Sequence, residues 1–347
     1  MYPALAVHGV LTSKVTDVET LWVGGEGGME ESLVRRQGIP FRSIPAAGLH
    51  GVNVTALPRN LFTIGRGVLA ARKLLHSFKP EVLFFTGGYV AVPVALAGRS
   101  IPSLLYVPDI EPGMALKSLS GSADVIAVTT DQSQKFFTKR VYETGYPIRT
   151  ELALWDRQTA HQHLNISGKL PVLLVSGGST GAHSINQAVL NNLPGLLAKF
   201  EVIHLCGERD WQVVKSASDG LPMELAPRYH AIAYLHEMGA ALAAADLVVS
   251  RAGASALGEY PLFALPAVLV PYPHTWRYQK VNADYLTRRG AAITLEDHRL
   301  NEDLLVTLIV LVENPNKLKA MRAAMFEMSH PRAAEKIASA LIELAGE

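Results

Sequence analysis

Short apolar runs alternate with longer amphipathic stretches along the whole chain. The runs are rich in Val, Ile, Leu and Phe and are bounded by turn-forming residues, as buried strands are. Strands are predicted at 19–23, 41–44, 82–85, 103–107, 124–128, 141–144, 172–176, 202–206, 231–234, 247–250, 267–271 and 292–295. Helices are predicted at 29–37, 61–78, 90–97, 113–118, 132–138, 182–192, 237–244, 254–263 and 279–289, with a helix start at 1–7 and a helical stretch at 301–346 that breaks near 314–316 and 331. This alternation is typical of an α/β protein whose parallel sheets are covered by helices on both faces.

The alternation pauses over the polar stretch 151–169 and then restarts. Because a domain has ~150 residues on average, a chain of 347 residues suits two domains. We predict two doubly wound, Rossmann-like domains, 1–155 and 165–325, that face a cleft. In such sheets, ligands bind beyond the carboxyl ends of the strands. We expect residues 326–347 to form a helix that packs back on the first domain.

Composition narrows the classes of protein. Apolar residues make up 49% of the chain, so the sequence is not intrinsically disordered. The 32 basic and 31 acidic side chains give a net charge of +1, which argues against a nucleic-acid partner. A single cysteine, Cys206, excludes a disulfide framework and a cysteine-built zinc site, and it indicates the reducing cytoplasm. No apolar run reaches the ~18 residues that a membrane span needs.

A glycine-rich loop is the sharpest local motif. The strand at 172–176 runs into Gly177-Gly-Ser-Thr-Gly181, and a helix follows. Glycines let the backbone approach a ligand closely, and a helix N-terminus offers N–H groups that suit a pyrophosphate. Ser179 adds a hydroxyl donor. The motif is neither a Walker A sequence nor a clean G-x-G-x-x-G, and a purely structural turn remains the alternative.

A second segment, Arg251–Glu259, also follows a predicted strand. Its small residues would let a flat group approach the backbone. Glu259 lies four residues after Ser255, so both could face a ligand from one helix, and the carboxylate could accept hydrogen bonds from ribose hydroxyls. The alternative is a small-residue helix packed on the sheet, with Glu259 in solvent.

The next predicted helix carries Gln279 and Asn282, which lie three residues apart and therefore on one face. Their amides could bind sugar hydroxyls, which need donors and acceptors together. The loop before this helix carries His274, a possible catalytic base, although a lone loop histidine is more often a contact residue. No His, Asp and Glu spacing resembles a metal site.

Together, Gly177-Gly-Ser-Thr-Gly-Ala182, Arg251-Ala-Gly-Ala-Ser-Ala-Leu-Gly-Glu259 and the Gln279 helix resemble the MurG family of GT-B glycosyltransferases. In the first half, Phe85-Thr-Gly-Gly-Tyr-Val90 and Thr144-Gly-Tyr-Pro-Ile-Arg149 are similar to further family segments. The resemblance covers essentially the whole chain. It implies inverting transfer of GlcNAc from UDP-GlcNAc to undecaprenyl-pyrophosphoryl-MurNAc-pentapeptide (lipid I), giving lipid II. It therefore implies a part in peptidoglycan synthesis, cell shape and cell division.

The resemblance also implies roles for single residues. Ser179 and the amides around it would bind the donor pyrophosphate, Glu259 the ribose, Leu235 the uracil and Gln279 the GlcNAc hydroxyls. The implied donor-binding residues are Arg149, Gly177, Gly178, Ser179, Gly181, Asn186, Leu235, Ala254, Ser255, Ala256, Leu257, Gly258, Glu259, Gln279 and Asn282. The implied acceptor-side residues are Gly87, Gly88, Tyr89 and Asp109. No metal or other cofactor is obligatory, because N–H groups and a helix dipole would neutralise the departing UDP.

Two departures from the family concern the first half. Tyr2-Pro-Ala-Leu-Ala-Val7 resembles the family segment just after the first glycine loop, Gly-Gly-Thr-Gly-Gly-His, and that loop and its strand are absent. We expect an opened N-terminal sheet and a natural start upstream. Where the family has His-Glu-Gln-Asn, this chain has Tyr106-Val-Pro-Asp109, so the acceptor could differ from lipid I. Asp109 is the candidate catalytic base, with Glu111 as the other carboxylate of the loop. A solvated loop acid is the alternative for both.

Residues 58–75 mix apolar side chains, such as Leu61 and Phe62, with four basic ones. This mixture suits an anionic lipid surface, so we expect peripheral binding to the cytoplasmic face of the cell membrane. An ordinary core-facing helix with a solvated basic side is the alternative. For the whole chain, three other functions stay open: a UDP-sugar glycosyltransferase with another lipid acceptor such as diacylglycerol, an isomerase like UDP-GlcNAc 2-epimerase, and an inactive sugar-nucleotide-binding homologue.

Overall fold

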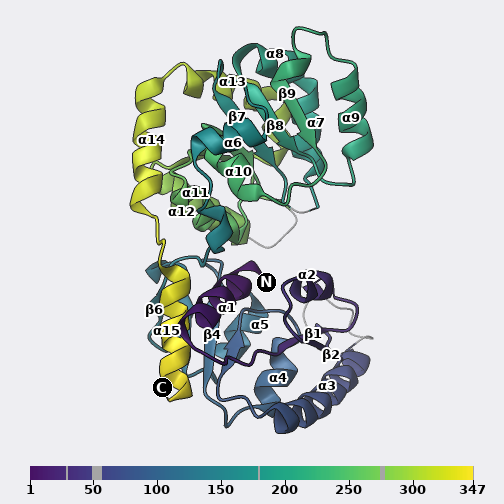
Figure 1. Ribbon diagram of the computed structural model, residues 1–347, viewed down its shortest axis with the longest axis vertical. Helices are drawn as coiled ribbons and strands as arrows, with labels where there is room; N and C mark the ends of the chain where they lie inside the picture. Colours follow the sequence, from purple (N-terminus) through teal and green to yellow (C-terminus); the bar gives the residue numbers. More distant parts are fainter. Residues whose placement is uncertain (29, 49–56, 179, 274–277, 347) are drawn as a thin grey trace. The chain divides into compact units, whose positions relative to one another are not determined.

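The computed structural model describes residues 1–28, 30–48, 57–178, 180–273 and 278–346. The chain divides into two compact units: Met1–Arg149 with Pro331–Glu347, called the first unit, and Thr150–His330, called the second unit. Every strand pair in both units is parallel, and helices connect the strands (Figure 1). The predicted α/β architecture is therefore confirmed.

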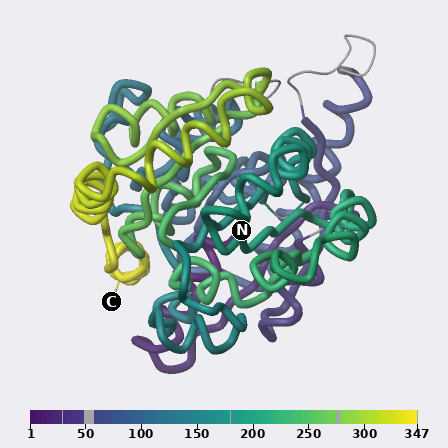
Figure 2. Tube along the Cα trace, turned by 90° about the horizontal axis from the view of Figure 1, so that it is seen from above, coloured from purple at the N-terminus to yellow at the C-terminus, as the bar shows by residue number. Residues whose placement is uncertain are grey.

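The second unit holds a six-stranded sheet of order β12-β11-β10-β7-β8-β9. Its strands are β7 (Val172–Ser176), β8 (Glu201–Leu205), β9 (Tyr229–Ile232), β10 (Leu247–Ser250), β11 (Ala267–Leu269) and β12 (Ala292–Thr294). Its helices are α6 (Arg157–His163), α7 (His183–Asn191), α8 (Leu193–Lys199), α9 (Trp211–Asp219), α10 (Met238–Ala244), α11 (Glu259–Leu262), α12 (Tyr278–Arg288), α13 (Leu300–Val312) and α14 (Pro315–Glu327). Figure 2 traces this path from teal to yellow-green. The chain builds outward from β7 to β9 and then returns to place β10 on the other side of β7, so the strand order reverses there.

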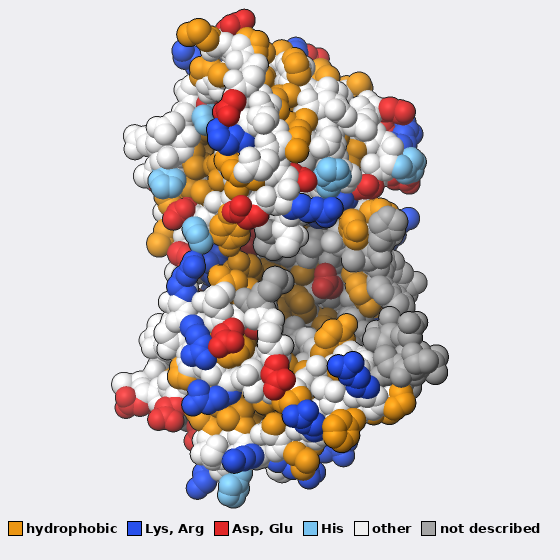
Figure 3. Space-filling view, turned by 90° about the vertical axis from the view of Figure 1, so that its right-hand side faces the viewer, with side chains coloured by type: hydrophobic (Ala, Val, Ile, Leu, Met, Phe, Trp, Pro, Cys, Tyr) orange, Lys and Arg blue, Asp and Glu red, His pale blue; other side chains and the backbone are white. Residues whose placement is uncertain are grey.

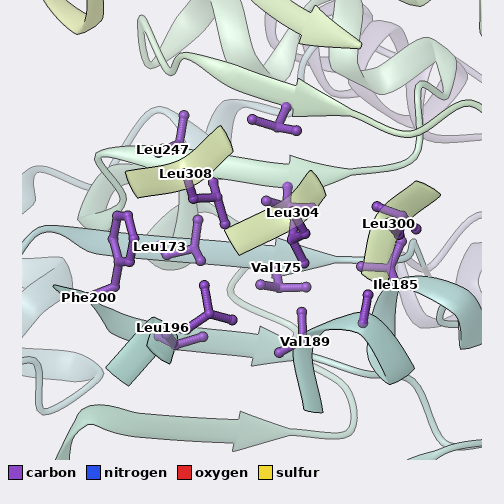
Figure 4. Packing of buried hydrophobic residues seen from close by; sticks show 14 of the residues in the cluster. Leu173, Val175, Ile185, Val189, Leu196, Phe200, Leu247, Leu300, Leu304 and Leu308 are labelled. Atoms are coloured by element: carbon purple, nitrogen blue, oxygen red, sulfur yellow. The ribbon is translucent and has the colours of Figure 1, made fainter. Parts of the chain in front are cut away.

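The core of the second unit is closed around β7. All five residues of this strand are buried, as expected for a central strand of a parallel sheet. Leu173 and Val175 lie in one cluster with Leu304 and Leu308 of α13 and with residues of α7 and α8 (Figure 4). The uninterrupted apolar run that identifies β7 in the sequence is thus the run that fills this core.

The first unit holds two separate sheets. Among the described residues, β1 (Trp22–Gly25) and β2 (Phe41–Ile44) form a two-stranded sheet, and a second sheet has the order β3-β4-β5-β6. The strands of that second sheet are β3 (Leu83–Phe85), β4 (Ser103–Val107), β5 (Val125–Val128) and β6 (Tyr142–Glu143). The helices are α1 (Tyr2–Lys14), α2 (Glu30–Arg36), α3 (Leu57–Phe78), α4 (Ala91–Ala97), α5 (Met114–Ser120) and α15 (Ala333–Ala345). The C-terminal helix α15 packs against α1 and β4, where Val7, Leu104 and Ile337 share one buried cluster.

A cavity of about 1090 Å³ in the first unit is lined by residues of β1 and β3, which belong to its two different sheets. Trp22 and Val23 of β1 line it together with Leu83 and Phe85 of β3. Val7 of α1 also lines it.

Some helices differ from the sequence pattern. The pattern does not predict α6, α8 and α9, which are short. Residues 254–263 form a 3-10 turn, η5 (Ala254–Leu257), and the four-residue α11, because the backbone at Gly258 (φ −130°, ψ −46°) leaves the helical region between them. Residues 132–138 are also not an α-helix. Residues 132–136 lie in the 3-10 turn η2 (Asp131–Phe136), and the chain is extended at Phe137. The Gln134 side-chain amide donates to the Lys139 carbonyl at 2.9 Å and accepts from the Val141 N–H at 3.0 Å, which holds this turn.

Candidate functional site

The two main motifs of the second unit lie side by side. β7 and β10 are neighbours, and their last residues, Ser176 and Ser250, are paired in register. The glycine loop that follows Ser176 and the segment that begins at Arg251 therefore leave the same edge of the sheet. This is the point where the strand order reverses, which is where parallel α/β sheets form a binding crevice.

The glycine loop ends at α7, which begins at His183 without a side-chain cap. A Cβ atom at Gly177 would lie 2.1 Å from the Ala182 nitrogen, and one at Gly181 would lie 2.1 Å from the Cys206 carbonyl oxygen. These two glycines are required by the packing of the loop itself. Gly178 differs, because it has a φ of +83° and a Cβ there would meet open space. Gly178 is thus the described position at which another molecule could come close to the backbone, whereas Ser179 lies outside the described residues.

Asn186 lies buried behind the loop. Its Nδ2 donates to the Cys206 carbonyl at 2.8 Å and to Asp210 Oδ2 at 2.7 Å. Its Oδ1 lies 3.0 Å from His204 Nε2, and Nδ1 of the same ring lies 2.7 Å from the Tyr229 hydroxyl. Asn186 therefore supports the segment against which Gly181 packs. Its predicted direct contact with a ligand stays a prediction, and these contacts favour a supporting role.

Only some residues of the Arg251–Glu259 segment are accessible from solvent. Ala256, Leu257 and Gly258 are buried, whereas Ala254, Ser255 and Glu259 are half-buried. The break at Gly258 removes the continuous helix on which the shared face of Ser255 and Glu259 is predicted. The buried hydroxyl of Tyr260 donates to Ser250 Oγ at 2.7 Å and holds α11 on the end of β10.

Gln279 and Asn282 of α12 have different surroundings. Asn282 is fully buried and donates from Nδ2 to the Ala252 carbonyl at 3.1 Å, so it ties α12 to the turn after β10. Gln279 is half-buried, and its Oε1 accepts from the Tyr272 backbone N–H at 2.9 Å. His274, in the loop before α12, lies outside the described residues. Gln279 therefore remains the amide of this pair that could reach a ligand.

Arg251 begins the second motif, but the sequence analysis gives it no role of its own. Its guanidinium group bonds Ser184 of α7 and Asp297 of the 3-10 turn η6 (Asp297–Arg299). Asp297 is 46 residues away in the sequence, and no spacing rule links the two. Leu235 lies farther along the same edge, half-buried in the loop after β9.

The predicted acceptor-side residues share one edge of the first unit. Gly87 (φ +107°) and Gly88 (φ +88°) follow β3, and Asp109 follows the neighbouring strand β4. Gly87, Gly88 and the exposed Tyr89 line the cavity of this unit. Because β3 and β4 are neighbouring parallel strands, these four residues follow the carboxyl ends of the strands at one edge of the sheet.

The two carboxylates of the loop after β4 differ in exposure. Glu111 is buried, with Lys117 Nζ at 4.0 Å from its Oε1, whereas Asp109 is half-buried. Arg149 is the last residue before the second unit begins, and its guanidinium carbon lies 4.7 Å from the ring centroid of Tyr2. Asp109 is thus the more accessible of the two acids.

The described residues offer neither a metal site nor a membrane span. No three His, Cys, Asp or Glu side chains in the described part of the chain are grouped so that they could hold a metal ion. Among the helices that the structure describes, none has both the length and the apolar character needed to cross a bilayer.

Two parallel α/β units, one of them with a glycine loop at the point of strand reversal, define a nucleotide-sugar-binding protein of the GT-B class. The chain belongs to glycosyltransferase family 28, in the MurG family. The model of that family's N-terminal domain matches residues 1–126, and the model of its C-terminal domain matches residues 172–337. Both the expected family and the expected fold are confirmed.

Individual proteins agree with this assignment. The UDP-N-acetylglucosamine--N-acetylmuramyl-(pentapeptide) pyrophosphoryl-undecaprenol N-acetylglucosamine transferase of Roseiflexus sp. (strain RS-1) is 38% identical over 97% of this chain and 91% of that protein. The crystal structure of Acinetobacter baumannii MurG is 25% identical, with a TM-score of 0.78 over 99% of this chain and 95% of that one. UDP-GlcNAc 2-epimerase from Neisseria meningitidis, bound to UDP-GlcNAc, has a TM-score of 0.68 over 99% of this chain and 96% of that one, and at 13% identity it shares the fold alone.

Proposed function

We propose that this chain transfers GlcNAc from UDP-GlcNAc to the lipid-linked acceptor lipid I, giving lipid II for peptidoglycan synthesis and thereby contributing to cell shape and division. One observation carries the donor half of the proposal. The glycine loop and the Arg251–Glu259 segment leave paired positions at the ends of β7 and β10. The names of the relatives support the choice of sugar and acceptor.

The donor would be bound by this edge of the second unit. The pyrophosphate would lie against the glycine loop near Gly178 and the first turn of α7, whose N–H groups and dipole attract anions. Glu259 would accept hydrogen bonds from the ribose, and Leu235 would lie beside the uracil. Gln279 would bind GlcNAc hydroxyls. The loop and helix N–H groups would stabilise the charge on the leaving UDP, so we propose that no metal is obligatory.

The reaction would be a single displacement with inversion. The acceptor hydroxyl oxygen attacks the anomeric carbon of GlcNAc while the bond from that carbon to the β-phosphate oxygen breaks. UDP departs with the electron pair, and a base takes the hydroxyl proton. We propose Asp109 as that base, because it is the more accessible carboxylate of its loop.

Incubating the chain with radiolabelled UDP-GlcNAc and lipid I tests this function. GlcNAc incorporation into lipid supports it, and labelling of diacylglycerol in place of lipid I would favour another lipid acceptor. Formation of ManNAc would favour an epimerase-like isomerase, and UDP binding without turnover an inactive homologue.

The role of Asp109 as the base is tested by comparing two Asp→Asn variants. Asp109→Asn should lower kcat by about 100-fold or more while leaving the Kd of UDP unchanged, since a general base typically contributes at least that factor. Asp131→Asn, which neutralises an exposed acid of the same unit, is the matched control and should retain full activity. Equal activity of both variants would contradict the assignment.

We further propose that α3 binds the anionic cytoplasmic face of the cell membrane. Ile64 and Ala71 face the core of the first unit, whereas Leu61, Phe62 and Leu69 are 53%, 70% and 66% exposed. The exposed basic residues of the helix are Arg59, Arg66, Arg72 and Lys73. On the face of the molecule drawn in Figure 3, basic and hydrophobic side chains lie beside one another on this unit. Exposed apolar groups among cations suit an anionic lipid surface.

Sedimentation with vesicles of phosphatidylglycerol tests the membrane proposal. Phe62→Ser combined with Leu69→Ser should abolish most binding, and a high salt concentration should weaken the binding of the unaltered chain. Val306→Ser removes a similarly exposed apolar side chain from the second unit and should bind as the unaltered chain does. Unchanged binding of the double variant would overturn the proposal.

A further inference from the structure

Arg251 occupies the centre of the β7–β10 edge. It directly follows β10, and its side chain is only 12% exposed. Nη1 donates to the Val270 carbonyl at 3.1 Å, and Nη2 donates to Ser184 Oγ at 2.8 Å. One side chain thereby joins the ends of β10 and β11 to the first turn of α7.

Asp297 closes this arrangement into a triangle. Its Oδ1 accepts from Arg251 Nη1 and, at 2.7 Å, from Ser184 Oγ. The Ser184 hydroxyl therefore gives its one proton to Asp297 and accepts from Arg251, so the three groups satisfy one another. The carboxylate also neutralises the guanidinium charge in a site with little water, where such charge-assisted bonds are strong.

The guanidinium group also supports the loop beyond β11. The ring centroid of Tyr272 lies 5.1 Å from the Arg251 guanidinium carbon, within cation–π distance. The backbone N–H of Tyr272 donates to Gln279 Oε1. Because Oε1 is engaged as an acceptor, Nε2 is the end of this amide that can donate to a ligand. Arg251 thus fixes, through Tyr272, how Gln279 presents its amide.

We propose that Arg251 is a positioning residue of the donor site, which acts through Asp297, Ser184 and Tyr272 and does not bind the pyrophosphate itself. It holds the first turn of α7 and the Gln279 amide in the geometry that accepts UDP-GlcNAc. This role rests on the proposed function. It assigns a task to residues that do not contact the donor but hold the groups that do.

Substitution of Asp297 separates positioning from direct contact. If Arg251 positions the site, Asp297→Asn weakens the triangle, and the Kd of UDP and the KM for UDP-GlcNAc both rise about tenfold, with kcat changed less. If Arg251 instead contacts the pyrophosphate, removing the competing carboxylate charge tightens UDP binding. Titration calorimetry with UDP measures the sign directly and needs no acceptor.

Substitutions of Arg251 and Ser184 test whether the planar guanidinium group is required. Arg251→Lys keeps the charge but not the planar donor pair, so it should weaken UDP binding as much as Arg251→Gln does. Ser184→Ala should give a smaller loss in the same direction. Arg289→Lys, an exposed arginine of the same unit, should bind UDP normally. Thermal melting of each variant shows that the fold is intact.

The outcomes distinguish this inference from the proposed function. If the unaltered chain binds no UDP, the proposed function fails and the inference falls with it. If the unaltered chain binds UDP but Asp297→Asn binds it equally or more tightly, or Arg251→Lys binds it normally, the positioning role alone is overturned.

Discussion

β7 of the second unit, Val-Leu-Leu-Val-Ser, and β1 of the first unit, Trp-Val-Gly-Gly, differ both in apolar content and in their neighbours. β7 pairs with β8 on one edge and with β10 on the other, and all five of its residues are buried. In the part of the chain that the structure describes, β1 has β2 as its one neighbour, and Gly24 is the one buried residue of β1. The burial of a parallel strand thus follows the strands on its two edges as well as its own apolar content.

The difference extends to the edge where each unit carries its site residues. Behind the glycine loop of the second unit, Asn186, His204 and Asp210 form a buried network of hydrogen bonds. In the first unit, Gly25 and Gly87 line the cavity instead. The predicted donor-binding residues thus lie on a tightly packed core, whereas the predicted acceptor-side residues lie beside a cavity.

Hydrogen exchange should show the largest effect of this difference. We expect the amides of β7 and β10 to exchange about 1,000-fold more slowly than those of β1 and β2, which corresponds to about 4 kcal/mol in the free energy of opening. Deuterium uptake of peptides from the four strands, measured by mass spectrometry, gives this ratio. Equal protection of β1 and β7 would contradict the comparison, because it would mean that the cavity is filled in solution.

A matched pair of leucines should show the next largest effect. Leu173→Ala in β7 should lower the free energy of unfolding by about 3 kcal/mol, because the fully buried side chain leaves a new void. Leu83→Ala in β3 should cost only about 1 kcal/mol, because Leu83 already borders the cavity and loses fewer contacts. Urea unfolding of the two variants measures both values. A larger loss for Leu83→Ala would show that the cavity is closed by other groups.

Much of the fold can be predicted from the sequence, because the spacing of apolar residues and the position of turn-forming residues are local features of the chain. Each of the twelve predicted strands corresponds to an observed one, and Val172–Ser176 and Leu247–Ser250 have the predicted bounds. The predicted helix over 254–263 is wrong because one backbone conformation, at Gly258, ends the turn. Propensity does not encode that conformation, since glycine also occurs inside helices.

The candidate site is predictable only where its residues are consecutive. The loops at Gly177 and Arg251 follow strands and can be placed on one edge from the α/β pattern. Asp297, by contrast, meets Arg251 through the pairing of β10, β11 and β12, and nothing near it in the sequence indicates this. Asn186 has a residue type that suits a ligand, yet its burial depends on His204 and Asp210 from other elements.

The two units also differ in the surroundings of one histidine each, which should make their stabilities depend differently on pH. Burial lowers the pKa of His204, in the second unit, to about 4. Its Nε2 faces the carbonyl oxygen of the Asn186 amide, so it carries the proton, and Nδ1 accepts from Tyr229; the ring is therefore held neutral. Burial also lowers the pKa of His8, in the first unit, but His8 lines the cavity and is only half-buried.

Acidification should therefore destabilise the second unit through His204. In the unfolded chain the pKa is about 6.5, so the unfolded state binds more protons, and the stability present above that pH is lost as pH falls toward 4. The loss from this group should reach about 2 kcal/mol at about pH 5. Urea unfolding at neutral pH and at about pH 5 measures it, and His204→Gln should remove most of that pH dependence, whatever its own stability. His8→Gln should remove a smaller part of the pH dependence, because the half-buried His8 ring is less desolvated than the fully buried His204 ring. An equal effect of both substitutions would mean that the two cores exclude water to the same degree, against the difference between β7 and β1.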